Sequence, residues 1–272
     1  MKFRKFIRTY RPFTRAGMLE SVAYRANFIC FLLGEIMSCF IMFFVWRAVF
    51  NETQVFSGFT MEDMVVYLFI TFLTGYLTYS DGTYAIATEI RDGSIAMRMI
   101  KPCSFDMCFL FQELGNKIFN VLVIFVPITA GVEIYRYVIT GEWQFNIAYF
   151  LLYIVSLILA YLISFYFNVS YGFMAFYLKN LWGADILKEV IVNFLSGATI
   201  PLAFMPAFLE TALNILPFSS LSYTPVMIYM GMYSPSEIVY RMLFQVFWLA
   251  AMILLSKLVW KHAVKRLCSQ GG

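Results

Sequence analysis

The chain has 272 residues, of which 61% are hydrophobic, 19% are aromatic and only 13% are charged, with a net charge of +4. A soluble domain usually has about a quarter of its residues charged, so this composition leaves too little polar surface to cover a globule in water. The chain therefore belongs in a membrane. This excludes a secreted globular enzyme, a disordered scaffold, a fibrous repeat and a nucleic-acid binder, and it leaves transporters, channels, membrane-embedded enzymes and assembly factors.

Residues 1–27 combine basic side chains with apolar ones at near-helical spacing. The apolar members are Phe3, Phe6, Ile7 and Tyr10, and they alternate with several Lys and Arg residues. This pattern predicts a helix that lies along the inner membrane interface with its cations toward anionic headgroups. Membrane anchoring is the simplest role for such a helix, and the alternative is that it also helps to seat a cytoplasmic partner.

Six segments are apolar enough, over about 20 residues each, to cross the hydrocarbon layer as helices. They are 28–50, 64–84, 118–139, 145–169, 186–206 and 237–258. With the N-terminus inside, all of the 20 Lys and Arg lie on the cytoplasmic side except Arg47, Arg136 and Arg241. The positive-inside rule therefore predicts a single all-α integral membrane domain over 1–272, with six spans in 28–258, and with both the N-terminus and the 259–272 tail in the cytoplasm.

The segment 85–117 is predicted to be the longest cytoplasmic loop. Apolar residues alternate with charged ones in its first half, Gly93 suits a tight turn or a helix end, and Pro102 cannot continue a helix. The pattern predicts a short amphipathic helix, a turn and a second short helix. Such an element is a docking surface for a soluble subunit or, alternatively, an ordinary interfacial loop.

The apolar stretch after residue 190 is interrupted by Gly197 and by four prolines, which are Pro201, Pro206, Pro217 and Pro225. Prolines at this spacing cannot sit in one straight spanning helix. We expect a helix that reaches the outer leaflet near 201–206, followed by a short re-entrant helix over 207–216. Irregular backbone at membrane depth is tolerated only where protein or a water-filled cavity covers it.

The sequence lacks the motifs of the common membrane-associated enzymes. No Gly-Lys dipeptide is present, so a GxxxxGK[ST] phosphate loop cannot form, and neither GxSxG nor HExxH occurs. The single histidine, His262, lies in the basic C-terminal region, and the five cysteines form no CxxC pair. We therefore expect a non-catalytic chain that binds no metal or cofactor itself.

Three acidic residues fall in or at the edge of the predicted spans: Glu35, Asp81 and Glu133. Carboxylates are costly in lipid, so each should face the bundle interior or a cavity, and Glu35 and Glu133 are candidate functional residues. Glu133 lies three positions before Arg136, so a local ion pair is its simpler explanation. Asp81 precedes Gly82 and is expected at a polar break at the end of a helix.

The chain resembles the membrane subunit of ABC-2 type exporters, in the branch of short permeases related to bacterial drug and antibiotic resistance. The resemblance covers about residues 3–266. It is carried by Tyr24-Arg25-Ala26-Asn27-Phe28, by Glu89-Ile90-Arg91-Asp92-Gly93-Ser94 leading to Ile100-Lys101-Pro102, by Leu195-Ser196-Gly197-Ala198-Thr199-Ile200-Pro201 with Phe204 and Pro206, and by Leu216-Pro217-Phe218.

The resemblance implies a dimeric permease of the bacterial inner membrane, paired with an identical or related permease and with two cytoplasmic ATP-binding subunits that hold ATP and Mg. It implies a coupling element that contacts the ATPase, formed by Glu89, Ile90, Arg91, Asp92, Gly93, Ser94, Lys101 and Pro102. It also implies an outer gate formed by Gly197, Pro201, Phe204, Pro206 and Pro217.

The apolar spans favour a hydrophobic or amphiphilic substrate such as a drug, lipid or peptide. Two other functions remain open at this point. One is a membrane assembly protein whose 89–102 loop only recruits a cytoplasmic partner. The other is an ion-coupled secondary transporter that uses Glu35 and Glu133, although no internal repeat of the kind found in such folds is seen.

Overall fold

The computed structural model describes residues 2–23, 25–51, 55–100, 103–178 and 180–265. In these ranges every regular element is a helix, and a single bridge between Phe56 and Phe59 is the one extended pairing. The elements in chain order are α1 (Lys2–Ala23), α2 (Arg25–Phe50), α3 (Met61–Thr78), α4 (Gly82–Arg91), α5 (Ile95–Met99), α6 (Phe105–Asn120), η1 (Val121–Phe125), α7 (Val126–Thr140), α8 (Ile147–Gly172), η2 (Phe173–Phe176), α9 (Trp182–Leu195), η3 (Leu202–Phe204), α10 (Ala207–Ile215), η4 (Pro217–Ser220), α11 (Tyr223–Tyr229) and α12 (Pro235–Ala263).

Five stretches of helix in the described ranges are long and apolar enough to cross a membrane: Leu32–Phe50, Met61–Arg91, Phe105–Thr140, Ile147–Phe176 and Pro235–Ala263. The predicted all-α membrane architecture is therefore confirmed. The remaining predicted span, 186–206, corresponds to α9, which has 14 residues and ends at Leu195. Because α9 is shorter than the roughly 20 residues that a crossing needs, the count of six spans stays a prediction.

Two predicted boundaries were wrong. The 64–84 helix ends at Thr78 and restarts at Gly82, with Asp81 in the break where a polar interruption was expected. The loop predicted over 85–117 ends at Ser104, because α6 begins at Phe105 and continues through one π-helical turn, η1, into α7. The charged residues of α6 masked this helix from a search for apolar segments.

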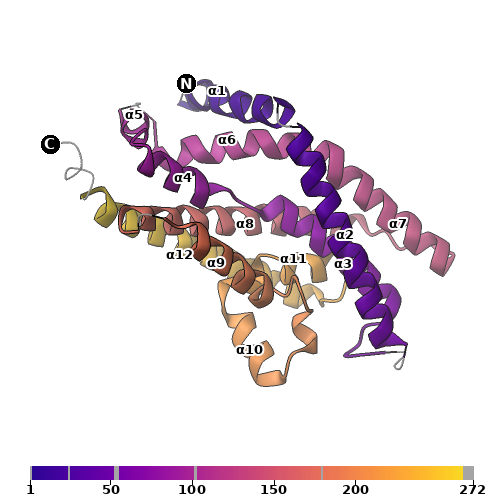
Figure 1. Cartoon of the computed structure of the whole chain (residues 1–272). Helices are drawn as coiled ribbons and strands as arrows, with labels where there is room; N and C mark the ends of the chain where they lie inside the picture. The colour runs from indigo at the N-terminus through magenta and orange to yellow at the C-terminus, as the bar shows by residue number, and fades with distance from the viewer. Residues whose placement is uncertain (1, 24, 52–54, 101–102, 179, 266–272) are drawn as a thin grey trace.

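Helix α1 lies along α6, side by side with it in Figure 1, and its position at the membrane interface stays a prediction. Tyr10 stacks on Phe111 with ring centroids 4.9 Å apart. The two backbones approach closely at Gly17 and Gly115, where an added Cβ would lie 2.0 Å from the carbonyl oxygen of Gln112 and 2.1 Å from that of Thr14, respectively. Only glycine permits this crossing, so α1 is seated on the helical bundle through its contact with α6.

Helix α8 lies at the centre of the bundle, in contact with α3, α4, α11 and α12. Its buried polar side chains have partners. Ser156 donates to the amide oxygen of Gln245 at 2.9 Å, and the Gln245 amide nitrogen donates to the carbonyl of Ser220 at 2.9 Å. Because an unpaired buried amide is costly, these bonds fix α12 and the η4 turn against α8.

The segment between α9 and α12 folds back as short helices. Gly197 has φ +80°, a conformation that favours glycine, and ends the α9 region. The short helix expected over 207–216 is present as α10, and Figure 1 shows it projecting from the main bundle between η3 and η4. After η4, every residue of α11 is buried, including Pro225. The proline-broken region therefore forms a separate helical element rather than one long span.

Candidate functional site

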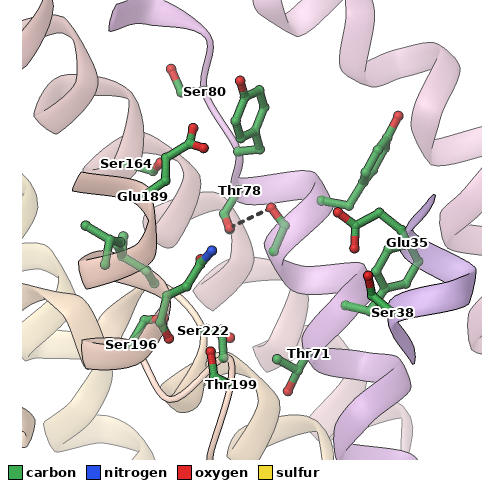
Figure 2. Close-up of a pocket in the computed structure, with 18 of the residues that line it drawn as sticks. Glu35, Ser38, Thr71, Thr78, Ser80, Ser164, Glu189, Ser196, Thr199 and Ser222 are labelled. Carbon is green, nitrogen blue, oxygen red and sulfur yellow. Dashed lines mark hydrogen bonds between the residues drawn. The ribbon is translucent and has the colours of Figure 1, made fainter. Parts of the chain in front are cut away.

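A cavity of about 460 Å³ lies between α2, α3, α8, α9 and the turn that follows α9. Its lining is unusually rich in hydroxyl groups for a chain this apolar. They belong to Ser38, Thr71, Thr78, Ser80, Ser164, Ser196, Thr199 and Ser222, and Figure 2 shows these side chains distributed around the space. The hydroxyl of Ser222 is buried and has no hydrogen-bond partner among the described residues. A polar ligand or water is the natural partner for such a group.

Two carboxylates also line the cavity: Glu35 comes from α2 and Glu189 from α9, on opposite sides of the view in Figure 2. Both are half-buried, and neither forms an ion pair within the described part of the chain. Lys188, the cation in the wall, lies 2.6 Å from Asp185 and donates to Asn168 at 2.6 Å. Because its charge is already engaged, the cavity carries excess negative charge.

The segment predicted to couple to an ATPase is a helical hairpin of α4 and α5. Gly93 has φ +75°, which reverses the chain after α4, and Ile95 is buried beneath the turn. The Arg98 guanidinium binds Glu89 through several charge-assisted hydrogen bonds, with Nε at 3.0 and 2.9 Å from the two carboxylate oxygens. Arg98 also lies over the ring of Phe109, 3.9 Å from its centroid. These contacts fix the hairpin to the start of α6.

The outer face of this hairpin is exposed. Arg91 and Asp92 have side chains that are 60% and 57% exposed, and Met97 and Ile100 are 66% and 76% exposed. In Figure 1, α5 lies at the same end of the molecule as the start of α1 and the C-terminal end of α12. An exposed surface of mixed charge and apolar character is suited to contact with a soluble protein.

Two of the predicted outer-gate residues, Gly197 and Phe204, contact residues from distant parts of the chain. The carbonyl of Gly197 accepts a hydrogen bond from the hydroxyl of Tyr67 at 2.6 Å. The ring of Phe204 has its centroid 5.3 Å from Trp46, 4.8 Å from Phe56 and 5.3 Å from Phe59.

Three prolines of this region stand at the starts of its short helices. Pro206 precedes α10 and Pro217 begins η4, and Pro201 precedes η3. Burial raises the pKa of Tyr223 in the adjoining α11 to about 12, so its hydroxyl stays neutral.

The structure brings some predicted site residues together and separates others. Glu89, Ile90 and Arg91 form the last turn of α4, and Asp92, Gly93 and Ser94 form the turn that follows it. Lys101 and Pro102 lie outside the described residues. The predicted ion pair of Glu133 with Arg136 is present at 3.7 Å. Glu35 and Glu133 line two different cavities, so no paired carboxylate site for a coupling ion is formed by them.

Three features of the candidate site were missed at the level of sequence. Arg98 is nine positions from Glu89, beyond any local helical spacing, and only the hairpin brings them together. Glu189 and the ring of hydroxyls come from separate helices, and their alignment on a cavity has no local signature. In the described ranges no cluster of three or more His, Cys, Asp or Glu side chains could hold a metal ion.

Several helical stretches long and apolar enough to cross a membrane, packed around a hydroxyl-lined cavity, indicate a polytopic membrane protein. The family model described as ABC-2 family transporter protein matches residues 36–271, which is most of the chain. The chain therefore belongs to the ABC-2 transporter family, as its resemblance indicated. No curated protein matches the sequence.

Proposed function

We propose that the chain is the permease subunit of an ATP-driven exporter that moves an amphiphilic substrate out of the cell. The observation that carries this proposal is the fixed α4–α5 hairpin, which offers an exposed face on a member of the ABC-2 transporter family. The chain lacks a phosphate loop, so active transport needs energy from another subunit. The hairpin is the element through which that subunit acts.

The hairpin is suited to transmit force because it is held rigidly. The pair of Glu89 and Arg98 closes it on one side, and Ile95 fills the space under the turn. Meanwhile, Arg91, Met97 and Ile100 remain available for contact. A subunit that binds the exposed face of the hairpin moves the start of α6 and the end of α4 together.

The cavity is the proposed substrate path. One end reaches Thr78 and Ser80 near the hairpin side, and the other reaches Ser196 and Thr199 beside the Gly197 turn. Phe167, Met42 and Leu68 add apolar surface to the same wall. A space that combines hydroxyls, carboxylates and apolar side chains suits an amphiphile, and its negative charge favours one with a cationic group.

The permease is proposed to act as a dimer. Helix α2 carries many exposed apolar side chains, among them Phe40, Ile41 and Phe44, at 58%, 58% and 48% exposure. Lipid or a second permease can cover such a face. With both termini on the cytoplasmic side of the inner membrane, two ATP-binding subunits carrying ATP and Mg complete the transporter.

Co-purification from native membranes tests the proposal. The wild-type chain should retain an ATP-binding subunit, and Arg91→Glu or Gly93→Pro should reduce either its retention or its rate of ATP hydrolysis by about tenfold. Glu142→Arg serves as the control, because Glu142 is also exposed but lies in the turn between α7 and α8.

Two results would count against the proposal. If both hairpin variants leave complex formation and ATP hydrolysis unchanged, the coupling role is wrong. If they abolish binding while reconstituted vesicles show no ATP-dependent substrate movement in the wild type, the chain is a recruiting membrane protein.

A further inference from the structure

A second cavity, of about 220 Å³, lies at the turn that joins α7 to α8. Its lining comes from the end of α7, from Gln144, Phe145 and Asn146 in the turn, from the start of α8 and from the end of α11. Because α7 and α8 each belong to a stretch that can cross a membrane, the turn between them lies where the membrane meets water. Trp143 and Tyr137 stack there at 4.9 Å and are exposed, as aromatic side chains at this depth usually are.

Two opposite charges face this cavity without using their full hydrogen-bonding capacity. The side chains of Glu133 and Arg136 are 10% and 13% exposed, and the guanidinium nitrogen lies 3.7 Å from carboxylate Oε1, beyond hydrogen-bond distance. Oε1 accepts a 2.5 Å bond from the hydroxyl of Tyr229, and Oε2 has no partner among the described residues. In the same ranges the Arg136 guanidinium donates no hydrogen bond, and its one other contact is with the Tyr229 ring at 5.8 Å.

Buried ions normally have their donors and acceptors satisfied, because an unsatisfied charged group loses its hydration without compensation. Here an anionic acceptor is buried and unsatisfied, and the adjacent cationic side chain donates no hydrogen bond within the described residues. A ligand that carries an anion and a cation a short distance apart would satisfy both at once. At about 220 Å³ the cavity has room for a ligand much larger than one water, which needs only about 10–15 Å³ of such space.

We propose that this cavity binds the headgroup of a zwitterionic phospholipid with a primary amine, such as phosphatidylethanolamine. The phosphate is held by the Arg136 guanidinium, whose planar fork matches phosphate oxygens. The ammonium donates to Oε2 of Glu133. A quaternary ammonium has no N–H to give to this oxygen, so a choline headgroup is the poorer fit despite the nearby aromatic rings of Tyr149 and Phe150.

The turn supplies further polar groups for the same headgroup. The side-chain oxygen of Asn146 is used to cap α8, accepting from the amide of Ala148 at 2.9 Å, which leaves the NH₂ of Asn146 available at the cavity. Gln144 lies beside it and is exposed. The proposal is independent of the transport function and of which membrane face the turn occupies.

Native mass spectrometry of the purified full-length chain tests the wild type first, with phosphatidylethanolamine, phosphatidylcholine and phosphatidylglycerol offered at equal concentration. We expect one retained phosphatidylethanolamine, with at least tenfold preference over phosphatidylcholine. Equal retention of the three lipids would overturn the proposal. Binding of soluble glycerophosphoethanolamine without any preference among the lipids would overturn the lipid assignment in favour of a free zwitterion.

The double variant Glu133→Gln/Arg136→Gln tests the site. It removes both charges, shortens the side chain at position 136 and keeps an acceptor for Tyr229 at position 133. We expect at least a tenfold loss of the retained lipid, while Glu142→Gln, an exposed carboxylate of the same turn, retains it. Unchanged retention by the double variant would refute the site. If that variant does not fold, as judged by its elution and thermal melting, the wild-type ratio of ethanolamine to choline lipid decides.

Discussion

The packing of α1 against α6 depends on Gly17 and Gly115, and replacing one of these glycines should weaken that packing. A methyl group at Gly115 would lie 2.1 Å from the carbonyl oxygen of Thr14, whereas ordinary contact begins at 3.4 Å. The backbones would have to separate by about 1.3 Å, the difference between these distances. A gap of this size forfeits at least about half of the dispersion energy of the contact atoms, because a gap of about 1 Å already loses about half.

We expect Gly115→Ala to weaken the docking of α1 by about 2 kcal/mol. A 2.1 Å contact with backbone lies at the upper end of the about 1–3 kcal/mol that overpacking costs, and alanine returns up to about 1 kcal/mol of helix propensity. The matched control is Gly131→Ala in α7, where an added Cβ meets nothing within 4 Å. The control should be neutral or more stable by up to about 1 kcal/mol.

Hydrogen exchange of the amides of residues 2–23, with the protein in lipid nanodiscs, measures the effect. A loss of about 2 kcal/mol corresponds to exchange about 30-fold faster than in the wild type. Gly131→Ala should exchange like the wild type. The reasoning is refuted if Gly115→Ala and Gly131→Ala give the same protection over α1.

Three further substitutions probe the hairpin and the outer region through thermal unfolding of the purified chain. Arg98→Met removes the charge-assisted bonds to Glu89 at 3.0 and 2.9 Å and should lower the free energy of unfolding by about 2 kcal/mol. An unchanged melting temperature would contradict the stabilising role of the pair. Gly197→Ala places a side chain at φ +80° and should cost about 1–2 kcal/mol, and a neutral result would mean that this turn relaxes freely. Phe204→Ala loses three aromatic contacts at 4.8 to 5.3 Å and should cost about 2–3 kcal/mol, whereas Phe204→Tyr should retain most of the stability.

The elements that depend on backbone preferences within a few residues were predictable from the sequence. The turn at Gly93, the short helix after Pro206 and the break at Asp81 each follow from backbone preferences that act within a few residues. The ion pair of Glu133 with Arg136 was predictable because its partners lie three positions apart on one helix.

Features that depend on distant partners were not predictable in the same way. The helix α6 contains Asp106, Glu113 and Lys117, which lower its hydropathy, and its polar groups are tolerated because other elements satisfy them. Glu113 accepts from Ser80 at 3.0 Å and from Tyr161 at 3.2 Å, and these partners are 33 and 48 positions away. A search by hydropathy counts these charges as loop-forming, although the fold pairs them.

These polar contacts also join the hairpin to the cavity. Thr83, in the first turn of α4, donates to Asn168 of α8 at 2.9 Å, and Lys188 of α9 donates to both of them at 3.2 and 2.6 Å. Asn168 and Lys188 line the cavity, while α4 continues into the hairpin turn at Gly93. We call Thr83, Asn168 and Lys188 the polar node. Under the proposed function, a displacement of the hairpin therefore strains the hydrogen bonds of this node before the displacement reaches the apolar core. Because such bonds break or persist as units, the node favours two discrete positions of α9 over a gradual drift.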